Sequence, residues 1–199
     1  MNELELKKHA NEIRKGIIRS VHAAKAGHPG GSLSSAEILT YLYFEEMKNI
    51  DPTNPDNPDR DRFVLSKGHA APVLYATLAE RGFFPKEELM TLRKIGSRLQ
   101  GHPDMNLVPG VDMSTGSLGQ GLSIACGMAL GLKLDKIDSF VYAYIGDGEA
   151  QEGQIYEAMM NAGHNRLNNL IAIVDRNSYQ IDGHTECVKS VNPIDKKFQ

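Results

Sequence analysis

The sequence predicts an α/β fold in which helices flank a mostly parallel central sheet, giving three layers. Two apolar runs of strand length, 140–145 and 170–175, are separated by an amphipathic stretch long enough for a helix. A strand–helix–strand unit of this length forms the right-handed crossover that builds parallel sheets. A shorter apolar run at 62–66 precedes a helical pattern near 70–81, which continues the alternation of strands and helices. We therefore expect one domain over residues 1–199.

The helices before the first strand follow from apolar periodicity and from residues that begin or end helices. Residues 4–26 place apolar side chains at helical spacing along one face. Gly27 follows, and we expect it to terminate this helix because glycine tolerates the left-handed conformation common there. Ser34 or Ser35 is expected to cap the next helix.

Two further helices are expected between the first strand and the crossover unit. Pro85 suits the first turn of a helix over 85–94, where a backbone N–H is not needed. Residues 118–132 are almost entirely apolar, which is typical of a helix that is buried all round. The segment between these helices, 96–114, is expected to be irregular.

Composition and charge exclude several classes of protein. The chain has 41% hydrophobic and 24% charged residues and a net charge of −3, which argues against nucleic acid or an anionic membrane as a partner. No apolar run could span a bilayer, and the N-terminus lacks the layout of a signal peptide. Cys126 and Cys187 have neither metal-site nor disulfide spacing. We expect a protein of the reducing cytoplasm.

Polar residues follow both strands of the crossover unit. Gly146-Asp147-Gly148 comes directly after the first strand, and Asn177 comes 30 positions after Asp147 (177 − 147), at the end of the second. The carboxyl ends of neighbouring parallel strands meet at one edge of the sheet, where open α/β sheets bind ligands. A carboxylate and an amide oxygen there suit Mg²⁺, and the backbone carbonyl of Tyr179 is a plausible third ligand. Because these ligands are few, we expect a bound diphosphate to complete the site. The simpler alternative is an ordinary turn in which Asp147 caps a helix.

This constellation resembles the thiamine-diphosphate signature, in which Gly-Asp-Gly is followed about thirty residues later by asparagine. Further segments resemble transketolases, in the same order along the chain, and together they cover roughly residues 12–199. These segments are Gly27-His28-Pro29-Gly30-Gly31-Ser32, Ser66-Lys67-Gly68-His69-Ala70, Gln100-Gly101-His102-Pro103, Ser114-Thr115-Gly116-Ser117-Leu118-Gly119-Gln120-Gly121 and Ile181-Asp182-Gly183-His184. The chain is most similar to the N-terminal subunit of split transketolases.

The resemblance implies a diphosphate-type thiamine-diphosphate-binding domain and a cofactor of thiamine diphosphate with Mg²⁺, for which Ca²⁺ or Mn²⁺ can substitute. It implies a reversible two-carbon ketol transfer between ketose and aldose phosphates, in the pentose phosphate pathway. The enzyme is expected to be active only with a C-terminal subunit, as a homodimer or heterotetramer. The resemblance also implies that this chain lacks the last helix and strand of its domain. The alternative is a short member of the family.

The resemblance also assigns individual roles. His28 and His102 are expected to be catalytic residues that line the substrate channel and stabilise charge on the substrate oxygens. Glu152 is expected to join a carboxylate network across the subunit interface. Metal ligands are Asp147, Asn177 and Tyr179, and the cofactor-binding residues are His69, Gly116, Ser117, Leu118, Gly148 and Asn177. Since transketolases often have proline in place of Ser117, that contact is expected to be mainly through the main chain.

Other functions remain open from the sequence. Another thiamine enzyme component, of the deoxyxylulose-phosphate synthase or 2-oxoacid dehydrogenase type, is one alternative. A non-catalytic assembly subunit that holds the diphosphate without turnover is another. A dinucleotide fingerprint is disfavoured, because Gly116, Gly119 and Gly121 have the wrong order and no strand immediately precedes them.

Overall fold

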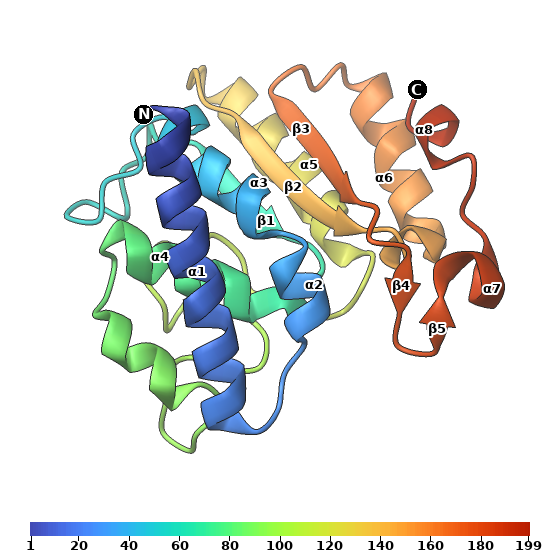
Figure 1. Ribbon diagram of the computed structural model, residues 1–199. Helices are drawn as coiled ribbons and strands as arrows, with labels where there is room; N and C mark the ends of the chain where they lie inside the picture. The colour runs from blue at the N-terminus through green and yellow to red at the C-terminus, as the bar shows by residue number, and fades with distance from the viewer.

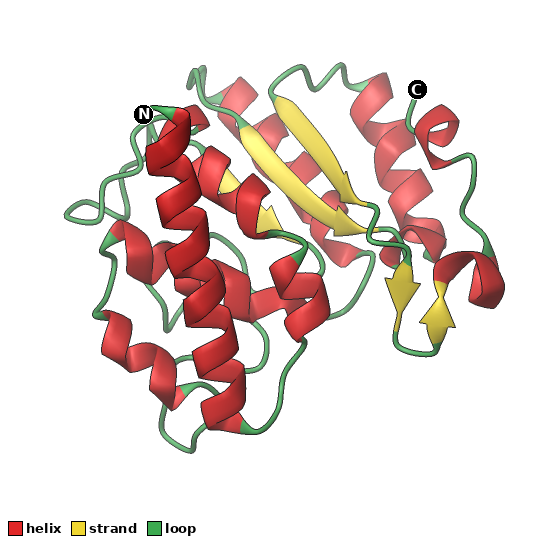
Figure 2. Ribbon diagram, viewed as in Figure 1, coloured by secondary structure: helices red, strands yellow, loops and turns green.

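The computed structural model describes residues 1–199 and is built around a parallel sheet of three strands (Figures 1 and 2). The strands are β1 (Arg62–Leu65), β2 (Val141–Gly146) and β3 (Leu170–Asp175), and they lie side by side in that order. The crossover between β2 and β3 carries the helix expected from the sequence. The predicted α/β fold is therefore confirmed.

Helices cover both faces of the sheet and make the three expected layers (Figure 1). One face carries α1 (Glu3–Ala24), α2 (Pro29–Leu33), α3 (Ala36–Tyr41) and α4 (Ala71–Arg81), with a π turn at Leu42–Glu46 and 3₁₀ turns at Gly68–Ala70 and Lys86–Thr91. The other face carries α5 (Gln120–Leu134) and α6 (Gly153–His164), the latter preceded by a 3₁₀ turn at Glu149–Gln151. The chain continues through the hairpin β4 (Tyr179–Gln180) and β5 (Gly183–His184) to α7 (Thr185–Lys189) and α8 (Ile194–Lys197).

The central strand β2 separates two apolar cores. Tyr142 and Tyr144 point into the core beneath α1, α3 and α4, whereas Ala143 and Ile145 point into the core beneath α5 and α6. This alternation follows from the two-residue period of a strand. Every residue of β2 is buried, so packing on both faces of the strand holds its carboxyl end in place.

The first helix begins as its sequence indicates but ends differently from our prediction. Asn2 and Glu5 form a capping box at its start. Lys25, and not Gly27, takes the left-handed conformation at its end, with a φ of 51°. The expectation for Gly27 was therefore wrong. The helix closes earlier because the N–H of Lys25 already bonds to the carbonyl of His22.

Three other expectations need correction. The segment Pro29–Leu33, which lies before the helix start expected at Ser34 or Ser35, forms the short helix α2, with Pro29 in its first turn. Residues 86–91 form a 3₁₀ rather than an α-helix. In a 3₁₀ helix, residues three apart eclipse, and this lets Leu89 and the following Leu92 both face the core.

The third correction concerns α5, which begins at Gln120 and is buried on one face only. Leu122, Ala125 and Ala129 are buried, whereas Leu130 and Leu134 are 37% and 72% exposed. The outer face of α5 is apolar but has no other element of this chain over it. Strand β3 similarly forms an open edge of the sheet, and most of its residues are only half-buried. None of the helices combines the length and apolar character needed to cross a membrane.

Candidate active site

Three chain segments leave the sheet at the same edge. His69 follows β1, Asp147 follows β2 and Asn177 follows β3. The strands are parallel, and Gly146 of β2 lies opposite Asp175 of β3. Neighbouring strands are about 5 Å apart, so the segment after β3 can reach the tip of β2 directly.

The tip of β2 is occupied by the buried side chain of Asp147, which is 2% exposed. Its Oδ1 accepts a hydrogen bond from the N–H of Gly148 at 3.0 Å. Its Oδ2 accepts bonds from the N–H of Ser178 at 2.9 Å and from Oγ1 of Thr185 at 3.2 Å. Asp147 does not cap a helix, so the simpler alternative for this residue was wrong.

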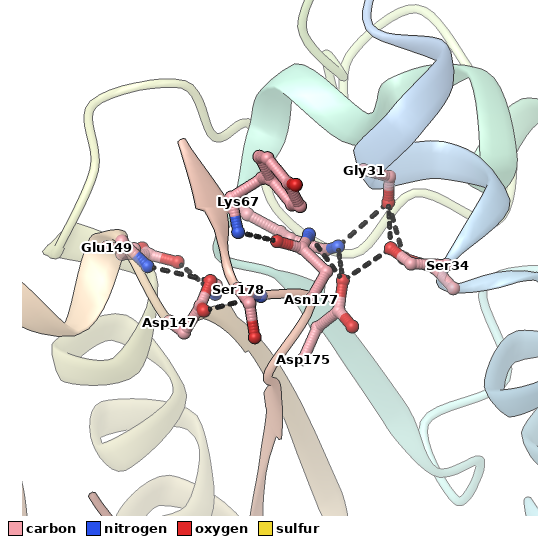
Figure 3. A network of polar contacts seen from close by, with 12 residues as sticks. Gly31, Ser34, Lys67, Asp147, Glu149, Asp175, Asn177 and Ser178 are labelled. Carbon is pink, nitrogen blue, oxygen red and sulfur yellow. Dashed lines mark hydrogen bonds and ion pairs between the residues drawn. The ribbon is translucent and has the colours of Figure 1, made fainter. Parts of the chain in front are cut away.

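The turn after β3 is therefore held on Asp147 through its backbone (Figure 3). Ser178 adopts a φ of 65°, which is uncommon for a residue with a side chain. Such conformations persist only where the surroundings enforce them, and they concentrate at functional sites. Here the hydrogen bond to Asp147 and the β4–β5 hairpin that follows hold Ser178 in this conformation. The neighbouring Asn177 accepts from the N–H of Tyr179 through Oδ1 at 3.0 Å.

This arrangement leaves oxygen lone pairs for a hard cation. A carboxylate has about four acceptor positions. Three hydrogen bonds use three of these positions on Asp147 and leave about one free. The amide oxygen of Asn177 has two, of which the N–H of Tyr179 uses one. A carboxylate oxygen, an amide oxygen and the nearby carbonyl of Tyr179 make an all-oxygen donor set of the kind that Mg²⁺ prefers. The residues present therefore fit the metal expected from the sequence.

A buried ion pair lies beside this turn. Nζ of Lys67, which is 1% exposed, lies 2.5 Å from Oδ2 of Asp175. Burial lowers the pKa of Lys67 below its ordinary value, and the carboxylate of Asp175 opposes this effect. We did not assign either residue from the sequence. Their positions could have indicated a role in the site, because both residues stand at the carboxyl end of a strand. Lys67 also belongs to the segment that resembles transketolases around His69.

Glu149 is a second buried acid that the sequence left without a role. Its carboxylate accepts from Oγ of Ser66 at 2.5 Å and from the N–H groups of Gly119 and Gly146 at 2.9 and 3.0 Å. Burial raises the pKa of Glu149 above its ordinary value, and these hydrogen bonds act in the opposite direction. Glu149 thus joins the ends of two strands to the start of α5.

The predicted site histidines from two distant segments are brought together. The rings of His28 and His69 lie 5.1 Å apart, edge to face. Burial and the neighbouring charges of His28, Lys67 and His102 lower the pKa of His69 to about 4. The pKa of His28 is also lowered, first by burial and then by Arg93 and His102. Both imidazoles are therefore kept uncharged near neutral pH, which leaves each with one N–H to donate.

His102 belongs to the same group because its ring lies against the main chain of Gly116. A Cβ added to Gly116 would come within 3.0 Å of the His102 ring. The hydroxyl of Tyr75 donates to the carbonyls of Gln100 and His102, at 3.0 and 3.2 Å, and so fixes the loop that carries this histidine. A Cβ on Gly68 would lie 2.7 Å from the nitrogen of Gly116. Two segments predicted to contact the cofactor are thus packed main chain to main chain, and the ring of His102 lies against one of them.

Gly116 and Ser117 line a pocket of about 210 Å³, and Leu118 does not. The other lining residues are Ser114, Thr115, Gln120 and Ile124. The sequence predicts that α5 begins at Leu118. The structure begins it at Gln120, with Gly119 as the N-cap at a φ of 86°, so Gly116, Ser117 and Leu118 all precede α5. Leu118 is 38% exposed.

The remaining predicted residues lie close to this pocket and to the turn after β3. A Cβ added to Gly119 would meet Cβ of Glu152 at 2.9 Å, which places Glu152 beside the start of α5. Glu152 and Tyr179 are both exposed to solvent. Gly148 packs against the side chain of Gln180, since a Cβ there would lie 2.9 Å from Oε1 of that residue.

The fold and this edge define an α/β domain that presents oxygen ligands and uncharged histidines at the carboxyl ends of its parallel strands. Residues 6–199 match the sequence model of a family described as "Transketolase, thiamine diphosphate binding domain". The chain belongs to this family.

Relatives of known name agree with that assignment. The chain is 50% identical over 197 residues to the 6-deoxy-6-sulfo-D-fructose transketolase subunit SqwG of a Clostridium species, covering 99% of this chain and 71% of the relative. It is 49% identical over 191 residues to an apulose-4-phosphate transketolase subunit from Phocaeicola vulgatus, covering 96% of this chain and 66% of that relative. The crystal structure of transketolase from Campylobacter jejuni matches with a TM-score of 0.92 and 35% identity, over 100% of this chain but 32% of that one. The chain thus spans about two thirds of the related subunits and about a third of a complete transketolase.

Proposed function

We propose that this chain binds the diphosphate end of thiamine diphosphate through Mg²⁺, as the N-terminal subunit of a two-subunit transketolase. The hydrogen bond from Ser178 to Asp147 carries the proposal, because it brings the turn with Asn177 and Tyr179 onto the tip of the neighbouring strand. In this proposal Asp147, Asn177 and the carbonyl of Tyr179 hold Mg²⁺, for which Ca²⁺ or Mn²⁺ can substitute. Phosphate oxygens of the cofactor complete its coordination.

The other residues of the edge have distinct tasks. His69, uncharged near neutral pH, donates an N–H to a diphosphate oxygen, and Gly148 lets the backbone approach the same group. Gly116, Ser117 and Leu118 present main-chain and apolar surface to the thiazolium ring. This surface lies beside His102, so cofactor and substrate positions adjoin.

When bound, thiamine diphosphate supplies the electron sink for cleaving the carbon–carbon bond of a ketose. His28 and His102 donate hydrogen bonds to the sugar oxygens and stabilise negative charge as it develops. The uncharged state of His28 near neutral pH leaves it free of a competing ion pair with the diphosphate. Glu152, exposed beside the start of α5, joins carboxylates of a neighbouring subunit.

The reaction we propose is the reversible transfer of a two-carbon ketol unit from a ketose phosphate to an aldose phosphate, in the cytoplasm and within pentose phosphate metabolism. Two relatives are described as transketolase subunits, which supports a C-terminal subunit as partner in a homodimer or heterotetramer. The edge of β3 is half-exposed and open to pairing with a further strand.

The test is reconstitution of the chain with its partner subunit, Mg²⁺ and thiamine diphosphate. Turnover is measured with xylulose 5-phosphate and ribose 5-phosphate, and then with apulose 4-phosphate and 6-deoxy-6-sulfofructose as donors. We expect ketol transfer by the assembly and none by either of the two chains on its own. Turnover by this chain alone would contradict the half-site assignment, and a stable assembly that binds cofactor but transfers nothing would favour the non-catalytic alternative.

Asp147→Ala should abolish the metal-dependent binding of thiamine diphosphate in the same assembly, measured by calorimetry. The matched control is Asp182→Ala, which removes an exposed carboxylate from the turn between β4 and β5. Equal cofactor affinity in the two variants would remove Asp147 from the proposed metal site.

A further inference from the structure

One carboxylate oxygen at the edge of the sheet gathers donors from three distant parts of the chain. Oδ2 of Asp175 accepts hydrogen bonds from Oγ of Ser34 at 2.6 Å, from Nζ of Lys67 at 2.5 Å and from Nδ2 of Asn177 at 3.2 Å. Figure 3 shows these side chains converging beside the turn that lies on Asp147. Asp175 itself is not among the residues expected to bind the metal or the cofactor.

The position of this oxygen is fixed by the buried cation. Lys67 also donates to the carbonyl of Gly31 at 2.8 Å, and its ammonium group lies 4.9 Å from the centre of the Tyr144 ring. The side chain of Lys67 is 1% exposed and that of Asp175 is 10% exposed. With bonds on several sides and almost no access to water, Lys67 holds the carboxylate in one place.

A fixed carboxylate determines which way the amide of Asn177 points. The carboxylate of Asp175 can only accept, so the amide must turn its NH₂ group toward it. The amide oxygen then points away from Asp175 and accepts from the N–H of Tyr179. Reversing the amide would set its oxygen against an anion and its NH₂ group against a backbone N–H.

We propose that Asp175, held by Lys67, is a positioning residue that turns the amide oxygen of Asn177 toward the magnesium ion. The inference rests on the proposed function, since Asn177 is a metal ligand only there. Partners behind a ligand commonly change metal affinity by about 10- to 100-fold when they are removed. Asp175 and Lys67 act through Asn177 and are not themselves ligands in this proposal.

Two double variants separate orientation from charge. Lys67→Met/Asp175→Leu removes the buried pair together with the acceptor for the Asn177 amide. Lys67→Met/Asp175→Asn removes the same two charges but keeps an amide oxygen that can accept from Asn177. Replacing a buried ion pair as a unit avoids leaving one charge without a partner. Both variants therefore have the same net charge and differ in the acceptor at position 175.

The dissociation constant of Mn²⁺ is measured by electron paramagnetic resonance on the assembly with its partner subunit and saturating thiamine diphosphate. Water-proton relaxation of the bound Mn²⁺ reports how many waters it carries. We expect the leucine variant to bind Mn²⁺ about 10- to 100-fold more weakly than the unmodified assembly, with one additional water on the metal. The asparagine variant should stay within about threefold of the unmodified assembly, since its acceptor remains.

Equal Mn²⁺ affinity and equal hydration in the two double variants would overturn the inference and leave the ion pair a purely structural role. If the leucine variant does not assemble, Lys67→Met/Asp175→Ala takes its place with the same expected outcome. Failure of the unmodified assembly to bind Mn²⁺ with thiamine diphosphate would instead reject the proposed function. The two failures are thus distinguishable.

Discussion

The backbone N–H of Gly119 donates a 2.9 Å hydrogen bond to the carboxylate of Glu149, 30 positions further along the chain. Gly119 is the N-cap of α5, and Glu149 follows the Gly-Asp-Gly turn after β2. This one bond therefore fixes the distance between the segment predicted to contact the thiazolium ring and the segment predicted to hold the metal. It is buried, so water does not compete for it.

Glu149→Gln should lower the free energy of unfolding by about 1–3 kcal/mol. Gly119 and Gly146 donate to different oxygens of the carboxylate, and glutamine has an NH₂ group in place of one of them, which leaves one buried N–H without an acceptor. Urea denaturation measures the change. The control is Glu157→Gln on the exposed face of α6, which should change the free energy by less than about 0.5 kcal/mol. Equal stability of the two variants would show that water satisfies the buried donors.

His69 should make the stability of the protein depend on pH. Its pKa is about 4 in the folded chain, below the ordinary value of 6.5, so between these values the unfolded chain binds more protons. The contribution of His69 to the free energy of unfolding should therefore be complete above about pH 6.5 and should decrease as the pH falls toward 4. Because His69 is only half-buried, we expect this contribution to be on the order of 1–2 kcal/mol.

Denaturation at several pH values, for the unmodified chain and for His69→Gln, isolates that contribution. The loss of stability between pH 6.5 and 4 should be smaller in His69→Gln than in the unmodified chain. It should be unchanged in His164→Gln, which alters an exposed histidine on α6. Bound diphosphate should raise the pKa of His69, since an anion favours the imidazolium form. Titration by NMR with and without inorganic diphosphate and Mg²⁺ measures this shift, and a pKa unmoved by diphosphate would argue against their contact.

Gly68→Ala should directly disturb the segment that we propose binds the cofactor. Its Cβ would lie 2.7 Å from the nitrogen of Gly116 and 2.8 Å from the carbonyl carbon of Thr115, so main chain must move. We expect a loss of about 1–3 kcal/mol in stability and weaker binding of thiamine diphosphate by the assembly. Thermal unfolding and calorimetry measure the two effects. Unchanged cofactor affinity would mean that segment 115–116 does not touch the cofactor.

Gly127→Ala, within α5, should raise the stability of the chain instead of lowering it. A Cβ at this helical position meets nothing within 4 Å, so the substitution should stabilise the isolated chain by about 0.5–1 kcal/mol. Binding of the partner subunit is then measured separately. Weaker association despite higher stability would place the exposed face of α5 in the subunit interface, and a loss of stability would contradict the helical geometry found here.

Tyr75→Phe should loosen the loop that carries His102 while leaving the core packed. The lost hydroxyl donates to the carbonyls of Gln100 and His102, and its removal should lower the free energy of unfolding by about 1 kcal/mol. In the reconstituted enzyme, kcat/KM should fall because His102 is no longer held toward the substrate. Tyr156→Phe on α6, distant from this loop in the fold, is the control. An unchanged kcat/KM in Tyr75→Phe would show that Gly116 alone positions the His102 ring.

Much of the fold could be predicted from local patterns. Residues Ala10, Ile13 and Ile17 recur at helical spacing and are buried on α1 as expected. The length between the two crossover strands predicted their parallel pairing, because a right-handed crossover needs a helix of about that size. Local signals were weakest at helix ends, where Lys25 rather than a glycine adopts the left-handed conformation.

The chain's own order of residues determined the α/β alternation, the strand tips on which Asp147 and Asn177 stand, and the family to which the chain belongs. Tertiary structure alone decided which side chains bond across that edge. Lys67 lies 108 positions from Asp175, and Ser34 lies 141 positions from it. No local pattern links residues so far apart, because their contact depends on how the strands align and how α2 packs. The direction of the Asn177 amide depends on those contacts, and it became visible only when the segments were brought together at one edge of the sheet.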